Sequence, residues 1–315
     1  MKGTVTKLYG KACTVRPDTP LLESYECYLR GRLFENPKTH FAVGDRVEFD
    51  PVEEFHRHGA SGDEDRLTGV IHEILPRRSA LYRPAKKREQ APQLVAANID
   101  QLVVVSALKR PTYKTGLIDR YLIISDRSEL RAVLCLNKID LGQPKEVERA
   151  RKALRTYQKL GYPLILTSAI TGEGCQELKE RLENKRSVLV GHSGVGKSKL
   201  AGRIQPGVIL TSSDVRRSGK GRHTTTVSSL IQLDFGGELV DTPGVRELGI
   251  ADIGRRELAR HFDEFEPYLG KCQFKSCSHI PEPGCAVKEA LQNKKIHRAR
   301  YESYERLYHE LSTRR

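Results

Sequence analysis

The sequence has no long apolar run and little else that would hold the chain to a membrane. None of its stretches approaches the roughly 18 consecutive apolar residues that a membrane-spanning helix needs. The polar start MKGTVTKLYGK lacks the apolar core of a secretion signal. Neither a lipidation signal nor a basic amphipathic anchor stands out. We therefore expect a cytoplasmic protein that does not act at a membrane.

The cysteines do not form the pattern of a disulfide framework. There are seven of them, an odd number. Four are scattered along the chain, and the other three lie close together beside one histidine: Cys272, Cys277, His279 and Cys285. Thiols clustered with a histidine indicate a metal site in a chain that we expect to be cytoplasmic.

Acidic residues are in the minority. The chain has 40 Asp and Glu against 54 Lys and Arg, which gives a formal charge of +14 and a pI ≈ 9.5. This excess favours a polyanionic partner, either nucleic acid or an anionic membrane surface, and charge alone does not choose between them. With 315 residues, 38% of them hydrophobic, the chain is long enough for about two or three domains.

Short strand-like segments make up the first part of the chain. In residues 1–75, runs such as TVTKLYG and DRVEFD are separated by Gly, Pro and charged turns. This pattern predicts a small antiparallel β domain, and a five-stranded barrel of the OB type fits it. Residues 76–93 are basic, contain proline and show no periodicity, so we interpret them as a linker or a flexible surface loop.

The rest of the chain alternates apolar strands with helices and ends in a helical region. In residues 94–265, strands such as LRAVLCLN and SVLVG are apolar on both faces, which predicts a parallel sheet covered by helices. Residues 266–315 hold the Cys/His cluster and then one long helix, expected over residues 286–311. The fold class is therefore multi-domain α/β, with an OB-like β-barrel, a P-loop domain and a mainly helical C-terminal domain that binds zinc.

The most specific motif is a phosphate-binding loop. Residues 191–198 match G-x-x-x-x-G-K-[ST], follow the strand-like SVLV and lead into the helix-compatible SKLAGRI. In such a loop the backbone N–H groups surround phosphate oxygens, Lys197 neutralises the β and γ phosphates, and the Ser198 hydroxyl binds Mg²⁺. The candidate phosphate-binding residues are Gly191, His192, Ser193, Gly194, Val195, Gly196, Lys197 and Ser198.

A downstream motif fits a site that senses Mg²⁺ and the γ-phosphate. In the segment LVDTPG, Asp241 would hold the metal through water, and the backbone N–H of Gly244 would approach the γ-phosphate. D-x-x-G by itself is a common pattern. Its position after the phosphate loop gives it weight.

A further motif indicates guanine rather than adenine. The carboxylate of Asp140, just after the apolar strand AVLCL, can accept hydrogen bonds from the ring N–H and the amine of guanine. A later strand end would offer a backbone N–H to the guanine carbonyl. We therefore expect GTP and GDP as ligands. The candidate base-binding residues are Asn137, Lys138, Ile139, Asp140, Ser168 and Ala169.

The order of these motifs is permuted, because the base motif precedes the phosphate loop, whereas ordinary small GTPases have the reverse order. With a β domain in front and a Cys/His cluster behind, the chain resembles the bacterial ribosome small-subunit-dependent GTPase A family, also called the RsgA or YjeQ family. The resemblance spans nearly the whole chain. It implies an OB-fold, a circularly permuted GTPase domain and a zinc-binding C-terminal region. It also implies a role in late maturation of the small ribosomal subunit, with that subunit and its rRNA as partners.

The basic, Gly-rich segment 218–226 is expected to order around the γ-phosphate and Mg²⁺. By the resemblance, Thr225 is the metal-sensing threonine, and the threonines on either side of it are chemically equivalent alternatives. The magnesium site would then consist of Ser198, Thr225 and Asp241.

Two groups found in other GTPases are missing. Val245 stands after Gly244, where many small GTPases have the glutamine that orients the attacking water. Similar histidines act in the family, so His223 is the candidate for this role, and a solvent-facing loop histidine is the alternative. Gly194 stands where some permuted GTPases have a potassium-binding asparagine. We expect slow intrinsic hydrolysis that the partner accelerates, with His223, Lys197 and Thr225 as the catalytic candidates.

The Cys/His cluster has the spacing C-x4-C-x-H-x5-C, which supplies four ligands for one closed tetrahedral Zn²⁺ site. Four protein ligands leave no position for a catalytic water, so we expect the zinc to be structural. Basic residues of the following helix suit contact with RNA phosphates, and a solvated charged face is the alternative. These residues are Lys288, Lys294, Lys295, Arg298, Arg300 and Arg306.

Together these features predict a monomeric enzyme that binds an immature small ribosomal subunit in the GTP form and leaves after hydrolysis. An alternative is an RNA-binding scaffold that senses the GDP/GTP ratio and hydrolyses GTP only incidentally. A P-loop kinase or ATPase is a further alternative, which the guanine motif disfavours.

Overall fold

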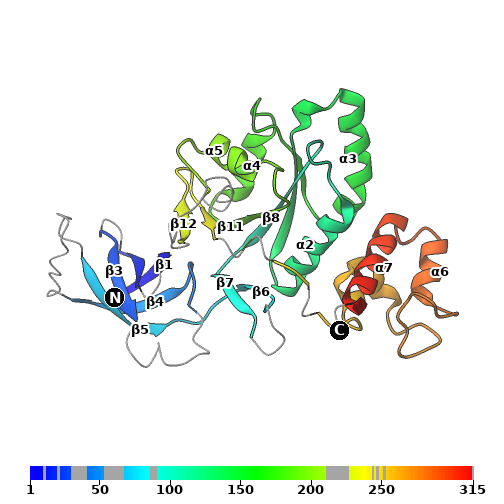
Figure 1. Cartoon of the computed structure of the whole chain (residues 1–315), viewed down its shortest axis with the longest axis horizontal. Coiled ribbons are helices and arrows are strands. Elements are labelled where there is room, and N and C mark those ends of the chain that lie inside the picture. Colours follow the sequence, from blue (N-terminus) through cyan, green and yellow to red (C-terminus); the bar gives the residue numbers. More distant parts are fainter. Residues whose placement is uncertain are drawn as a thin grey trace. The chain divides into compact units, whose positions relative to one another are not determined.

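In the computed structural model the chain forms two compact units. Figure 1 shows their helices and strands, coloured along the sequence. The first unit comprises Met1–Gln101, Lys179–Val188 and Gln205–Glu247, and the second comprises Leu102–Leu178, Leu189–Ile204 and Leu248–Arg315. The structure describes residues 1–9, 12–19, 22–29, 41–52, 67–85, 91–210, 227–242, 245, 248–250 and 253–313. Among these residues no helix combines the length and the apolar character that a membrane crossing requires. The domain limits expected from the sequence stay predictions.

A five-stranded barrel forms the start of the first unit, as predicted. Its strands are β1 (Lys2–Tyr9), β2 (Ala12–Pro17), β3 (Tyr25–Leu29), β4 (Arg46–Val52) and β5 (Thr68–Ile74). They pair in the order β1-β2-β3-β5-β4, and β1 also pairs with β4, which closes the barrel. Burial alternates along the strands because successive side chains point to opposite faces. The barrel core contains Val5, Val15, Cys13, Cys27, Tyr25, Val47, Phe49 and Ile71.

The first unit also contains strands outside the barrel. β6 (Ala80–Arg83) and β7 (Gln93–Ala97) form a two-stranded antiparallel sheet. Residues 76–93, which the sequence shows as aperiodic, thus contain β6 and the first residue of β7, and their role as a linker stays a prediction. Four residues are too few for a periodic pattern, so pairing with β7 rather than local sequence defines this strand.

A buried arginine joins several segments of the first unit. β13 (Glu238–Asp241) pairs in parallel with the start of β11 (Arg186–Val190) and antiparallel with β12 (Ser228–Gln232). From β11, Arg186 donates to the Glu238 carboxylate at 2.8 Å and to the Gly44 carbonyl at 2.8 Å. Arg16 pairs with the same carboxylate. The side chains of Arg186 and Glu238 are each 11% exposed, so this is a largely desolvated ion pair.

The second unit contains the predicted α/β architecture. β9 (Arg131–Asn137) lies between β8 (Gln101–Ala107) and the parallel strand β10 (Leu164–Leu166). Every residue of β8 is buried, which is typical of a strand covered on both faces. The helices that follow these strands are α2 (Thr115–Arg127), α3 (Pro144–Lys159) and α4 (Cys175–Leu182), and the residues of α4 from Lys179 onward belong to the first unit. A capping box that joins Gln143 and Glu146 begins α3.

The C-terminal region of the second unit is mainly helical, with one correction. It contains η4 (Leu258–His261), η5 (Asp263–Tyr268), α6 (Ala286–Gln292) and α7 (Arg298–Thr313). The single helix expected over residues 286–311 is thus two helices. Lys294 has a φ of 57°, and the N–H of Lys295 bonds back to the Ala290 carbonyl at 2.9 Å, which ends α6.

Candidate functional site

Glycines shape the phosphate-binding loop, which lies where the sequence predicts it, after β11 and before α5 (Lys197–Ile204). Gly191, Gly194 and Gly196 have φ values of 143°, 82° and 98°. These values lie in the region that favours glycine. A Cβ on Gly191 would also lie 2.1 Å from the Val105 carbonyl oxygen. The motif therefore needs glycine at these positions for the backbone conformation of the loop itself, and not only to make room for a ligand.

Lys197 begins α5 and folds back over the loop. Its ammonium group donates to the carbonyl of Gly191 at 2.8 Å and to that of His192 at 3.1 Å. Tyr121 of α2 also contacts the loop, through a hydrogen bond with the backbone of Gly191, and burial raises the pKa of this tyrosine. The positive charge thus lies beside backbone that can receive phosphate oxygens.

Asn137 ties the base motif to the phosphate loop. Its side chain is 1% exposed, and its amide nitrogen donates to the Val195 carbonyl at 3.0 Å. Its amide oxygen accepts from the Ala169 N–H and the Thr167 hydroxyl, each at 3.2 Å. The structure therefore brings three separate sequence motifs together around one amide side chain.

Two more residues of the base motif are positioned by hydrogen bonds. Ser168 donates from its hydroxyl to the Asp140 carboxylate at 2.6 Å, which orients an otherwise exposed carboxylate. The ammonium group of Lys138 donates to the Gly194 carbonyl at 2.5 Å and to the Arg110 carbonyl. Burial and the charge of Lys199 lower the pKa of Lys138. The Asp140 carboxylate and the backbone at Ala169 can offer an acceptor and a donor to a guanine base.

The remaining nucleotide-site candidates divide into two groups. Asp241 is the last residue of β13 in the first unit and is 2% exposed, and its neighbour Thr242 accepts a hydrogen bond from the Ser228 hydroxyl at 2.9 Å. His223, Thr225 and Gly244 lie outside the residues that the structure describes.

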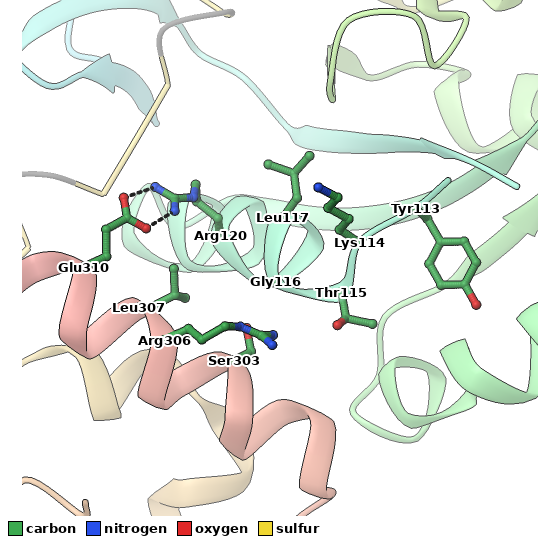
Figure 2. Close-up of a pocket in the computed structure, with 10 residues that line it drawn as sticks. All are labelled: Tyr113, Lys114, Thr115, Gly116, Leu117, Arg120, Ser303, Arg306, Leu307 and Glu310. Carbon is green, nitrogen blue, oxygen red and sulfur yellow. Dashed lines mark hydrogen bonds and ion pairs between the residues drawn. The ribbon is translucent and has the colours of Figure 1, made fainter. Parts of the chain in front are cut away.

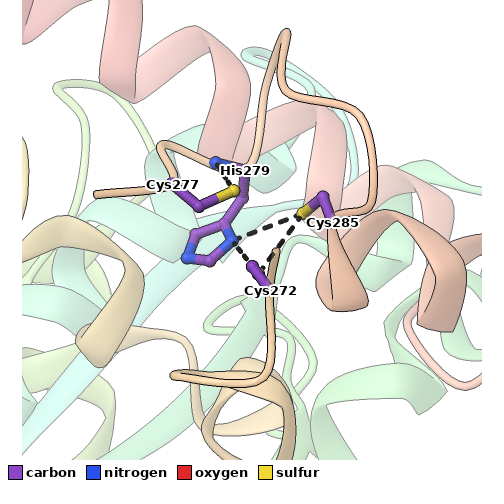
Figure 3. Close-up of side chains that lie close together, drawn as sticks. All are labelled: Cys272, Cys277, His279 and Cys285. Carbon is purple, nitrogen blue, oxygen red and sulfur yellow. Dashed lines mark hydrogen bonds between the residues drawn. The ribbon is translucent and has the colours of Figure 1, made fainter. Parts of the chain in front are cut away.

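The four predicted metal ligands meet in the second unit. Figure 3 shows their side chains pointing toward one another, and all four ligand atoms lie within 4.8 Å. His279 Nδ1 lies 3.5 Å from Cys272 Sγ and 3.4 Å from Cys285 Sγ, and the two sulfurs are 3.9 Å apart. Around a tetrahedral Zn²⁺ with Zn–S of about 2.3 Å, sulfurs lie about 3.8 Å apart. The donor set and its spacing therefore fit zinc.

Electrostatics and packing agree with a structural metal site. Burial lowers the pKa of His279, which keeps the imidazole neutral, and burial raises the pKa of Cys277 to about 12. A metal ion bound between these groups would stabilise the thiolate. The hydroxyls of Tyr301 and Tyr304 on α7 donate to the carbonyls of His279 and Ser278, both at 2.7 Å. These bonds attach the loop of residues 272–285, called the metal loop below, to α7.

Sequence reasoning missed Glu282, which holds the metal loop in shape. Its carboxylate accepts from the N–H and hydroxyl of Ser278 at 2.9 Å each, and from the Ile280 N–H at 3.2 Å. Burial would raise the pKa of Glu282, but these hydrogen bonds lower it to about 2. Tyr121 was missed as well. An exposed-looking glutamate or a helical tyrosine carries no motif, so no local signal could have found either residue.

The fold and the site define a class of protein: a circularly permuted P-loop GTPase with a β-barrel before it in the chain and a cluster of three cysteines and a histidine after it. A family model described as "RsgA GTPase" matches residues 74–251. The chain belongs to the RsgA GTPase family.

Relatives match almost the full length of the chain. The "Small ribosomal subunit biogenesis GTPase RsgA" of Thermotoga neapolitana is 39% identical over 312 residues, which cover 98% of this chain and 96% of the relative. The protein of the same name from Chlorobaculum tepidum is 38% identical, with 96% of each chain covered.

Two solved structures share the fold. The crystal structure of YjeQ from Thermotoga maritima matches with a TM-score of 0.79 and 38% identity, covering 100% of this chain and 99% of the other. The structure of YloQ, described as a circularly permuted GTPase, matches with a TM-score of 0.73 and 27% identity, covering 100% and 96%. The expected family and fold class are thereby confirmed.

Proposed function

We propose that this protein binds the small ribosomal subunit and hydrolyses GTP as a timing switch in the late maturation of that subunit. The observation that carries the proposal is the assembly around Asn137, which joins the phosphate loop to the guanine motif. Relatives with matching length are named small ribosomal subunit biogenesis GTPases, which supports the choice of partner. The formal charge of +14 suits a partner rich in RNA phosphates.

Each candidate residue has a role in this proposal. The backbone of residues 191–198 surrounds the β-phosphate, and Lys197 balances the charge of the β and γ phosphates. Ser198, Asp241 and Thr225 hold Mg²⁺, which stabilises negative charge on the phosphates. Asp140 reads the guanine edge, and the Ala169 N–H donates to the guanine carbonyl.

Catalysis and switching are assigned to the segment around His223 and to Gly244. His223 positions the attacking water, because Val245 carries no group that could form a hydrogen bond with it. The Gly244 N–H senses the γ-phosphate. The cluster of Cys272, Cys277, His279 and Cys285 holds one structural Zn²⁺, whose closed coordination supplies no catalytic water. We propose that the protein works in the cytoplasm as a monomer.

GTP turnover by the purified protein tests the proposal, measured alone, with small subunits and with large subunits. We expect slow intrinsic turnover and strong stimulation by the small subunit only. Lys197→Ala should abolish turnover, because it removes the ammonium group that lies over the loop backbone at Gly191 and His192 and that would balance the charge of the β and γ phosphates. Lys199→Ala is the matched control, since Lys199 is an exposed lysine on the same helix. Tight GTP binding without stimulation would support the scaffold alternative instead.

The role of His223 is tested separately. We expect His223→Ala to keep the affinity for GTP and to lose the stimulated hydrolysis, because the histidine acts on water and not on the nucleotide. Stimulated turnover equal to that of the wild type would remove His223 from the mechanism.

A further inference from the structure

A cavity of ≈ 600 Å³ lies between the beginning of α2 and one side of α7, both in the second unit. Figure 2 shows residues from the first turn of α2 facing Ser303, Arg306 and Leu307 of α7. None of the phosphate-loop or base-motif residues lines it. The cavity is therefore a feature separate from the nucleotide site.

α2 begins at this cavity, and two backbone N–H groups of its first turn make no hydrogen bond with the described residues. Lys114 occupies the N-cap position without a capping hydrogen bond from its side chain, and the first turn contains no acidic residue. The Lys114 carbonyl accepts from the N–H groups of Leu117 and Ile118. Within the described part of the chain, the N–H groups of Thr115 and Gly116 have no acceptor. Helix N-termini of this kind carry partial positive charge and favour anions.

Two side chains of α7 reach the same turn. A Cβ placed on Gly116 would lie 3.4 Å from an Arg306 guanidinium nitrogen and 3.5 Å from the Ser303 hydroxyl oxygen. Ser303 is 0% exposed, and its hydroxyl has no hydrogen-bond partner among the described residues. A buried hydroxyl left without a partner is uncommon, because it loses hydration without compensation. An acceptor or donor supplied by a ligand would satisfy it.

The charges around the cavity do not balance. Arg120 and Glu310 neutralise each other through a two-pronged ion pair, in which one guanidinium nitrogen lies 3.1 Å from the carboxylate (Figure 2). Lys114 and Arg306 have no acidic partner within the described residues. Two cations beside the positive end of a helix repel one another, and an anion bound between them would offset this repulsion.

We propose that this cavity binds a phosphate group. Its oxygens would accept from the N–H groups of Thr115 and Gly116, from the Arg306 guanidinium and from the Ser303 hydroxyl. A guanidinium with adjacent backbone donors suits tetrahedral oxyanions in particular. The phosphate could belong to the backbone of RNA or to a small phosphorylated compound, since both present the same oxygens. Phosphate binding in this cavity does not depend on GTP hydrolysis, so this proposal and the proposed function can be tested separately.

Backbone amide signals of Thr115 and Gly116 provide a direct test by NMR. The ¹⁵N-labelled full-length protein is first saturated with GDP and Mg²⁺, so that the phosphate loop is occupied. It is then titrated with inorganic phosphate against a chloride titration of equal ionic strength. We expect saturable shifts of both amides with phosphate and none with chloride. If phosphate leaves both amides unshifted, the proposal is wrong.

Matched variants show whether the predicted groups hold the anion. Arg306→Gln should weaken phosphate binding by about ten-fold or more, because it removes a charge-assisted donor. Arg298→Gln removes one positive charge from the same helix at a residue that does not line the cavity, and should change binding by less than about two-fold. Gly116→Ala should also weaken binding by filling the cradle, while its unfolding midpoint stays equal or rises because alanine favours helix. Equal affinities of the Arg306 and Arg298 variants would contradict the assignment.

A single-stranded RNA without terminal phosphates identifies the source of the group. If this RNA shifts the same amides at lower concentration than phosphate does, the site binds the RNA backbone. If only inorganic phosphate shifts them, the site serves a small phosphorylated compound. Either result supports a phosphate site. If inorganic phosphate does not shift the amides, the proposal is wrong, whatever the RNA does.

Discussion

Replacing Arg300 with methionine should destabilise the second unit more than any exposed substitution on α7. Arg300 is 2% exposed, and its guanidinium contacts two carboxylates that are buried as well. It donates to Glu264 through two nitrogens, at 2.7 and 3.0 Å, and to Asp119 at 2.5 Å. It also lies 4.5 Å from the centre of the Phe262 ring. Burial lowers the pKa of Arg300, but the hydrogen bonds with Glu264 and the charge of Asp119 outweigh it and raise the pKa.

Loss of the guanidinium would leave two carboxylates unpaired in the protein interior. Breaking a buried ion pair in this way typically costs about 3–5 kcal/mol. For a unit of about 150–250 residues, each kcal/mol shifts the unfolding temperature by about 2–4 °C, so we expect a decrease of about 6–20 °C. Substituting Glu264→Gln in the same chain should restore part of the loss, because it removes one of the two buried charges.

Calorimetry would measure the change in unfolding temperature. Because the two units need not unfold together, hydrogen exchange of the α7 amides would measure the stability of the second unit by itself. Arg298→Met is the matched control, since the Arg298 side chain is 85% exposed and its ion pair with Glu302 lies at the surface. The control should change stability by less than about 0.5 kcal/mol. If Arg300→Met costs no more than this control, the buried network does not stabilise the unit and the reasoning is wrong.

Three further predictions concern the other sites. Gly196→Ala should weaken GDP binding, because the new methyl carbon would lie 2.6 Å from the Asn137 amide nitrogen at a backbone φ of 98°; an unchanged affinity for a fluorescent GDP analogue would contradict this. Cys277→Ser should lower the zinc retained per chain after dialysis against a chelator, and retention equal to the wild type would exclude this ligand. Arg186→Met should destabilise the protein at neutral pH by less than about 3 kcal/mol, because Arg16 still pairs with the Glu238 carboxylate. Burial raises the pKa of Glu238, but Arg186 and Arg16 lower it below 4.5, so the stability it contributes is present above that pH and lost below it. The cost of Arg186→Met in denaturant titrations should therefore shrink as the pH falls below about 4.5, and a cost that does not depend on pH would refute this explanation.

Contiguous motifs were predictable because short segments determine them. The phosphate loop needs glycines at fixed positions, and the structure shows the positive φ values that explain them at Gly191, Gly194 and Gly196. The meeting of Cys272, Cys277, His279 and Cys285 was predictable because these residues lie close together in the sequence. The barrel and the α/β unit followed from alternating burial and from strands that are apolar on both faces.

Local sequence patterns did not predict β6 or the end of α6, because a partner strand determines the first and the backbone of a turn determines the second. β6 is too short to show a period, and it exists because β7 pairs with it. The end of α6 depends on the backbone of Lys294, a residue type that does not usually end a helix. In both cases the deciding interaction was not visible in the local pattern of hydrophobic residues.

By itself, the sequence determined which chemical groups are present, because each motif is a short run whose spacing matches one ligand. Only the tertiary structure decided which distant groups meet. The amide of Asn137 bonds to a carbonyl 58 residues away, and Arg300 reaches Asp119 across 181 residues. The cavity on α2 likewise combines its first turn with side chains of α7. Such contacts have no signature in either segment alone, because they depend on how the chain packs and not on local spacing.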